Sequence, residues 1–410
     1  MWRQLRIKFE QRLDENRNFM KITRIECLEL RAPHVKPEDC DGAVDTAVIR
    51  VTTEDQTCGI GETDAPPNAI AALLETPSTH IWSMSIRDLV LGENAIEVEQ
   101  IWNKVYEGTI YHGRRGLGLM LMSALDNALH DLRGKLLGVP AYQLLGGAAR
   151  NSVTPYATLF PSMPQGRSWP EMHAACLQLM ERALDIGFRA LKMEMLFYDL
   201  VTDRHLIDFV HLCRKLAGDE RAFMIDVGYR WKNWNDALWA LQRIEDDHLL
   251  FVETPLHTDD LDGLQRLADS TTTPVAAGEF LQTRHEFAEL IARGHCDVIQ
   301  PDMGRVGGLT EGVRCARFAA ERGLLCVPHA WKTGLTVAAT RQFGFAVPNC
   351  PYVEHFHPDL FPSVLRSRLA RPEFHLKDGA WTLPTDPGLG VELDEQVVEQ
   401  CLVRPLTVIQ

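Results

Sequence analysis

The chain has 410 residues, of which 45% are hydrophobic and 24% charged, and its formal net charge is -14. These values are typical of a soluble globular protein with a large core, and the acidic balance argues against general binding to nucleic acid or to an anionic membrane. The length exceeds one ordinary domain; a barrel of about 250 residues plus a second unit of roughly 150 would account for it.

The first stretch, residues 1–19, is partly basic but also carries Glu10, Asp14 and Glu15, so we expect a polar N-terminal extension and not a targeting peptide. No run approaches the roughly 20 apolar residues of a membrane-spanning helix. Ten cysteines are scattered without a CxxC pair. We therefore expect buried, reduced thiols and a cytoplasmic location.

An α+β unit is predicted for residues 20–150. Residues 20–32 and 45–65 alternate apolar and polar side chains around a turn-rich gap, as strands of a β-meander do. Gly59 and Gly61 are followed by neither GKS/T nor GxGxxG, so we expect a tight bend at a strand end. Helices should follow, the strongest over 117–138, where Asp126 and Asp131 are expected to pair with arginine or backbone groups and not to act as catalysts.

Six apolar runs between residues 222 and 354 each end in an acid or a histidine, at steps of 23 to 27 residues. Short apolar runs that alternate with helical stretches predict βαβ units and a parallel sheet. Strands are expected to start near 153, 189, 222, 249, 274, 296, 324 and 351. We predict a (β/α)₈ TIM-type barrel over 151–363 and an α+β capping domain that the tail, about 364–410, completes.

Three successive runs end in Asp226, Glu253 and Glu279. In a barrel their carboxylates would converge at the mouth, where three anions crowd together only around a cation. All-oxygen ligation suits Mg²⁺. The alternative is that each acid caps the helix that follows it.

The next two runs end in Asp302 and His329, which would be neighbours at the same rim. A carboxylate bonded to one imidazole nitrogen fixes the tautomer and leaves the other nitrogen free to take a proton. The pair is therefore a candidate catalytic base, although a single strand-end histidine is more often structural.

These residues resemble the enolase superfamily, and within it the mandelate racemase branch, over nearly the whole chain from Met20. A lysine at the position of Asp302 would instead indicate the muconate lactonising branch. The stretches that carry the resemblance are SALDNALHDLRGK, IDVG with Asp226, FVETP with Glu253, AAGEF with Glu279, QPDMGRVGG with Asp302, VPHAW with His329 and PYVE with Glu354.

The resemblance implies one Mg²⁺ that chelates a small-molecule carboxylate while His329 removes the proton α to it, as enolase-superfamily sites do. It also implies that Glu354 hydrogen-bonds the far carboxylate oxygen, for which it should be protonated and its pKa raised. We expect no nucleic-acid or membrane partner, and a homo-oligomer.

The chain departs from the family pattern at Lys192 and Glu194, because the second lysine of the usual KxK motif is replaced by Glu194. The two side chains could pair with each other or act beside a leaving hydroxyl. One secure base favours dehydration of an aldonate or aldarate to a 2-keto-3-deoxy acid. Cycloisomerisation of a sugar acid lactone, racemisation or epimerisation of a 2-hydroxy acid, and a non-catalytic binding scaffold are the alternatives.

Specificity is expected from loops at the barrel mouth and from the segment 33–45 of the cap. Candidate substrate contacts are His34, Lys36, Tyr111, His112, Arg114 and Arg305.

Overall fold

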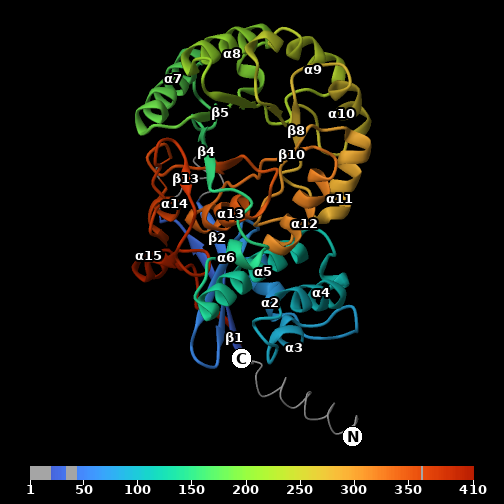
Figure 1. Cartoon of the computed structure of the whole chain (residues 1–410), viewed down its shortest axis with the longest axis vertical. Coiled ribbons are helices and arrows are strands. Elements are labelled where there is room, and N and C mark those ends of the chain that lie inside the picture. Colours follow the sequence, from blue (N-terminus) through green and yellow to red (C-terminus); the bar gives the residue numbers. More distant parts are fainter. Residues whose placement is uncertain (1–19, 34–43, 362) are drawn as a thin grey trace, which may run out of the picture.

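A computed structural model describes residues 20–33, 44–361 and 363–410 (Figure 1). The predicted extension 1–19 and most of the turn-rich segment, with His34 and Lys36, lie outside the described residues. Among the helices that are described, none combines the length and apolar character needed to cross a membrane. The nine described cysteines are free, and all but Cys58 are buried.

The cap is an antiparallel sheet covered by helices. Its strands follow the order β15-β1-β2-β3, so the last strand of the chain pairs with the first, with Ile409 opposite Ile25. The strands are β1 (Ile22–Arg31), β2 (Asp45–Thr53), β3 (Cys58–Thr63) and β15 (Thr407–Ile409), and the helical segments are α2 (Pro67–Glu75), α3 (Ile86–Val90), α4 (Val98–Gly108), η2 (Ile110–His112), α5 (Leu117–Leu137) and α6 (Ala141–Leu144).

Helix α5 packs directly on β3, which corrects the expectation of a bend at Gly59 and Gly61. Both glycines lie inside β3, and a Cβ on Gly61 would stand 2.6 Å from the amide nitrogen of Ala128 on α5. Glycine is required here for close approach of helix and strand, not for a turn. Asp131 of α5 accepts hydrogen bonds from the Ile60 amide (3.0 Å) and the Leu389 amide (2.7 Å), as expected for a structural acid.

Eight parallel strands follow in the order β10-β9-β8-β7-β6-β5-β4-β11, which confirms the predicted α/β barrel. In the described chain no ladder joins β10 to β11, but the Cys326 amide donates to the Asn349 carbonyl at 2.9 Å. Each predicted strand start lies within three residues of the observed one: β4 (Ser152–Leu159), β5 (Ala190–Glu194), β6 (Ala222–Asp226), β7 (Val252–Glu253), β8 (Val275–Ala277), β9 (Val298–Ile299), β10 (Leu325–Cys326) and β11 (Tyr352–His355).

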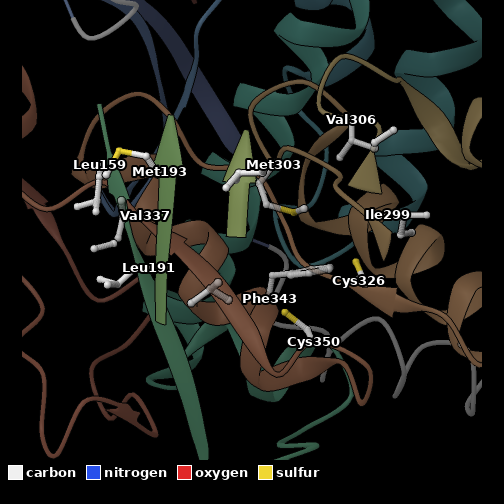
Figure 2. Packing of buried hydrophobic residues seen from close by; sticks show 14 of the residues in the cluster. Leu159, Leu191, Met193, Ile299, Met303, Val306, Cys326, Val337, Phe343 and Cys350 are labelled. Atoms are coloured by element: carbon white, nitrogen blue, oxygen red, sulfur yellow. The ribbon is translucent and has the colours of Figure 1, made fainter. Parts of the chain in front are cut away.

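Helices wrap the outside of this sheet, and Figure 1 shows α7 to α10 as an outer arc. Figure 2 shows Leu191 and Met193 of β5 in the apolar layer that also holds Val337 and Phe343 of α13. The helical segments are α7 (Trp169–Ile186), η3 (Tyr198–Leu200), α8 (Asp203–Ala217), α9 (Trp234–Leu241), η4 (Glu245–Asp247), α10 (Leu261–Ala268), α11 (Thr283–Glu289), η5 (Leu290–Gly294), α12 (Gly308–Ala320) and α13 (Gly334–Ala346). Because side chains alternate along a strand, Lys192 and Glu194 of β5 point to the barrel interior.

The tail contacts both units. Strand β13 pairs antiparallel with β4 of the barrel, whereas β15 joins the cap. Its elements are α14 (Val364–Arg368), β12 (Ala370–Arg371), which pairs with β14 (Glu392–Leu393), β13 (Trp381–Thr382) and α15 (Glu395–Cys401).

The cap is fixed to the barrel by Glu62, a buried carboxylate on β3. It accepts hydrogen bonds from the Thr336 amide and hydroxyl, both at 2.7 Å, from the Thr333 hydroxyl at 2.8 Å and from the Thr46 hydroxyl at 2.9 Å. Thr333 and Thr336 flank the start of α13, so a cap residue satisfies the first amides of a barrel helix and interacts favourably with its dipole.

We predict that Glu62→Ala destabilises the protein by roughly 2 to 4 kcal/mol, because buried donors at the start of α13 lose their acceptor. The measurement is the midpoint of chemical denaturation followed by circular dichroism. Glu54→Ala, a change at an exposed acid at the end of β2, is the control. Equal midpoints for the two variants would contradict the role of Glu62 in fixing the cap to the barrel.

Candidate active site

The polar side chains at the strand ends meet in a cavity of about 350 Å³. Five charged residues line it: Glu194, Asp226, Glu279, Arg305 and His329. Its remaining walls are mostly apolar or aromatic and include Phe160, Met163, Leu196, Tyr198, Tyr229, Phe280 and Trp331. A few convergent polar groups among apolar walls are typical of a small-molecule site.

His329 and Asp302 form a close pair beside this cavity. Nδ1 of His329 lies 2.5 Å from Oδ2 of Asp302, and Nε2 lies 3.3 Å from Oε2 of Glu279. Burial and the Arg305 guanidinium act to lower the pKa of His329, but Glu354, the Asp302 hydrogen bond and Glu279 outweigh them and raise it to about 9. The pair therefore has the arrangement of an oriented base, with Asp302 on one nitrogen and the second nitrogen toward the carboxylates of the cavity.

Lys192 is the electrostatic centre of the barrel interior. Its Nζ lies 2.9 Å from Glu253 Oε2, 3.0 Å from Glu354 Oε1, 3.6 Å from Glu194 Oε1 and 4.0 Å from Asp226 Oδ2. Burial lowers the pKa of this ammonium, yet Glu253 and Glu354 hold it well above its usual value. Pairing with Glu194 is thus only one of four contacts, and it is not among the two shortest.

The environment of Glu354 contradicts the expectation of a raised pKa. The Thr158 hydroxyl donates to it at 2.5 Å and the Ala330 amide at 2.6 Å. Burial alone would raise the pKa of Glu354, but Lys192 and His329 lower it to about 2. The prediction of a protonated Glu354 was wrong, because the sequence did not show that the ammonium of Lys192 would touch it.

The three predicted metal ligands lie at the ends of β6, β7 and just after β8, and they do not cap the helices that follow. The N-caps of α9, α10 and α11 are Asn233, Asp260 and Gln282. The alternative explanation for the strand-end acids is therefore wrong.

The oxygens of the predicted ligands Asp226 and Glu253 differ in their hydrogen bonding. Asp226 uses Oδ1 to accept from Thr254 (2.7 Å) and the Gly228 amide (2.9 Å), whereas buried Oε1 of Glu253 has no hydrogen-bond partner. Burial, opposed by Lys192 and reinforced by Asp226, raises the pKa of Glu253 to about 7.

This donor set suits a hard divalent cation, which would reduce the repulsion among the three carboxylates and bind the unpaired Oε1 of Glu253. As the side chains stand, no three acids, histidines or cysteines among the described residues form a metal cluster. Glu279 is held instead by the Tyr229 hydroxyl at 2.9 Å and faces Arg305 at 3.4 Å.

Among the predicted substrate contacts that lie within the described residues, only Arg305 lines the cavity. It is bound to Asp64 of the cap, with Nη2 at 2.6 Å from Oδ2. Tyr111 is 64% exposed and stacks on His80, outside the cavity lining. Arg114 is exposed, and His112 contacts Ser83, so neither belongs to the lining.

Sequence reasoning missed the tyrosines of the lining, Tyr198 and Tyr229. Tyr229 lies three residues after Asp226, so its closeness in sequence to a predicted metal ligand could have marked it as a candidate for the lining. Both have positive φ angles, 43° and 58°, which no sequence pattern indicated.

Comparison with known proteins agrees with this geometry. A profile described as the mandelate racemase/muconate lactonizing enzyme N-terminal domain matches residues 22–146, and one described as enolase C-terminal domain-like matches residues 175–397. The chain belongs to the mandelate racemase/muconate lactonizing enzyme family. It is therefore an enzyme of the enolase superfamily, as its sequence motifs predicted.

Relatives within this family include D-galactonate dehydratase of Xanthomonas euvesicatoria, 30% identical over 331 residues that cover 77% of this chain and 82% of that protein. D-galactarolactone cycloisomerase of Agrobacterium fabrum is 28% identical over 358 residues, which cover 86% and 90%. A solved structure of 3,6-anhydro-D-galactonate cycloisomerase from Zobellia galactanivorans has a TM-score of 0.80 at 26% identity, over 94% of this chain and 100% of the other.

We predict that Lys192→Met destabilises the enzyme by about 3 to 5 kcal/mol, because Glu253 and Glu354 would be left as buried, unpaired charges. The midpoint of chemical denaturation at neutral pH measures the loss. Lys215→Met, on the exposed side of α8, is the matched control and should be close to neutral. A stability of Lys192→Met equal to that of the control would show that the ammonium does not hold this cluster.

Proposed function

We propose that this enzyme dehydrates a sugar acid, an aldonate or aldarate, to a 2-keto-3-deoxy acid with Mg²⁺ as cofactor. The observation that carries the proposal is the His329–Asp302 pair, whose free nitrogen faces the carboxylates of a cavity that Glu194 also lines. Glu194 belongs to β5, which β11 and β4 separate from β10, so the cavity places two different proton-transfer groups at separate points of its wall.

Each residue has a distinct role in this proposal. His329 in its neutral form removes the proton α to the carboxylate through Nε2, while Asp302 holds the ring in the required tautomer. Glu279 is one of the acids that raise the pKa of His329 to about 9, so a cation bound to Glu279 would favour this neutral form. Glu194 lines the cavity from β5 and is placed to protonate the departing C3 hydroxyl; burial and the Asp226 carboxylate hold its pKa above its usual value. Lys192 and Glu354 do not line the cavity; the Lys192 ammonium offsets part of the negative charge of the interior, and Glu354 holds the loop after His329 through the Ala330 amide.

Asp226, Glu253 and Glu279 would hold the Mg²⁺. When bound, the ion acts as a Lewis acid that stabilises the negative charge developing on the substrate carboxylate. The vacant oxygen of Glu253 and the crowding of Asp226, Glu194 and Glu253 support this assignment.

Cycloisomerisation of a sugar acid lactone is the second candidate. It also needs one base, and the relative that covers 86% of this chain is named a D-galactarolactone cycloisomerase. Racemisation or epimerisation is less well supported, because a glutamate stands where the second base would be.

A panel of aldonic and aldaric acids, incubated with enzyme and Mg²⁺, should give a 2-keto acid from at least one member. His329→Asn and Asp302→Asn should lower kcat for that substrate by about 100-fold or more, the usual range for loss of a positioned base. Keto acid is measured colorimetrically, and exchange of the α-proton is followed by NMR in heavy water. Exchange without keto acid would contradict dehydration and favour an isomerase.

Mg²⁺ should stabilise the wild-type enzyme by about 2.7 kcal/mol at 100 times its dissociation constant, since only the folded protein has the site. The rise in melting temperature measures this effect. Asp226→Asn should abolish the rise, whereas Asp259→Asn, an equivalent change at an exposed acid, should keep it. A wild-type melting temperature that Mg²⁺ leaves unchanged would contradict the metal site.

A further inference from the structure

A second cavity adjoins the active-site cavity, and the proposed reaction does not use it. We call it the side chamber; it has a volume of about 660 Å³ and lies between residues 198–203 and 228–236. Tyr198, Gly228 and Tyr229 line both cavities, so the two are neighbours that share these residues. The active-site cavity alone, at about 350 Å³, already falls within the range of roughly 300 to 1,000 Å³ found for small-molecule sites. A six-carbon acid therefore has no need of the side chamber.

Of the three residues that the two cavities share, both tyrosines have backbone conformations that are unfavourable for a residue with a side chain. Tyr198 has a φ of 43° and Tyr229 a φ of 58°, values in the left-handed region that residues with a Cβ seldom adopt. Gly228 has a φ of 50°, and a Cβ at that position would overlap Cδ2 of Leu196. Strained positions of this kind persist where the surrounding structure holds them, and they concentrate at functional sites.

The side chamber is held together by one guanidinium. Arg230 donates to Asp203 Oδ1 at 2.7 Å, to the Val201 carbonyl at 2.7 Å and to the Tyr198 carbonyl at 3.0 Å. The indole of Trp231 donates to the other oxygen of Asp203 at 3.1 Å. These bonds join the loop after β5 to the loop after β6, so the walls are fixed before a ligand arrives, which reduces the entropic cost of binding.

The groups that remain free in the side chamber carry opposite charges. Asp199 and Lys232 are exposed and make no hydrogen bond or ion pair with any described residue. An apolar ligand would desolvate both charges without compensation, and an anionic or cationic group would meet a like charge. Hydroxyl groups both donate and accept, so a hydroxyl-rich neutral group satisfies both side chains, while the rings of Tyr198 and Tyr229 cover its apolar C–H face.

We propose that the side chamber binds a further sugar ring, so that the natural substrate is a glycosylated aldonic acid. This inference rests on the proposed function and names its substrate class. The aldonic acid end occupies the active-site cavity, and the second ring passes between Tyr198 and Tyr229. The chemistry remains loss of the C2 proton and the C3 hydroxyl as water, and the glycosidic bond is neither formed nor broken.

The test compares simple aldonates with the same aldonates carrying a glucosyl or galactosyl ring at O4 or O6. With Mg²⁺ and wild-type enzyme, at least one glycosyl aldonate should have a kcat/KM about tenfold or more above that of its parent. Turnover of simple aldonates with poorer or no turnover of every glycosyl form would overturn this inference and leave the proposed function standing. Absence of keto acid from both groups would overturn both.

Substitutions in the side chamber test whether the second sugar ring binds there. Asp199→Trp fills the side chamber and should lower the ratio of kcat/KM for the glycosyl aldonate to that for its parent by about tenfold or more. Lys232→Ala should lower the same ratio through KM. Glu220→Trp, an identical change at an exposed acid after α8, is the control and should leave the ratio unchanged. Equal ratios in wild type, Asp199→Trp and Lys232→Ala would overturn the assignment of the side chamber.

Discussion

The interior of this barrel depends on one buried ammonium among four carboxylates. Lys192 lies within 4.0 Å of Glu194, Asp226, Glu253 and Glu354, which come from four different strands or strand ends. Charges removed from water in this way persist only when they are paired. Burial, reinforced by Asp226 and Glu354 and opposed by Lys192, raises the pKa of Glu253 to about 7. Lys192 and His329, together with hydrogen bonds from Thr158 and the Ala330 amide, lower the pKa of Glu354 to about 2. One cation against four acids still leaves a net negative interior. This excess of negative charge favours the binding of a divalent cation at the site.

The cap contributes to this interior by fixing the two loops that carry the base. Helix α5 holds the loop after Asp302: Ser123 accepts from the Gly307 amide at 2.8 Å, and Asn127 donates to the Met303 carbonyl at 2.8 Å. Glu62 of β3 holds the start of α13, five residues after His329. Ser123, Asn127 and Glu62 of the cap thus position Asp302 and His329 from outside the barrel, although none of the three lines the cavity.

The sequence predicted most of this architecture because strand period and strand-end chemistry are local properties. The repeat of 23 to 27 residues placed six of the eight barrel strands, β6 to β11, and the acids that end the runs do lie at one rim. What it did not predict depends on contacts between distant parts of the chain. The ionisation of Glu354 follows from Lys192, which is distant in sequence, and Gly59 and Gly61 are required by the approach of α5. The left-handed backbone at Tyr198 and Tyr229 is a tertiary property that no pattern of residue types encodes.

The ion pairs of Lys192 also bear on which reaction the proposed enolate intermediate would undergo. A racemase needs a group on each face of the substrate that alternates between base and acid. Lys192 is 1% exposed and holds Glu253 and Glu354, so deprotonating it would leave buried carboxylates without a counter-ion. That leaves Glu194 as the residue of β5 that reaches the cavity, where we propose that it donates a proton. A base at His329 and an acid at Glu194 match the needs of an elimination, in which one group removes a proton and another protonates a departing hydroxyl, better than those of a symmetric two-base reaction.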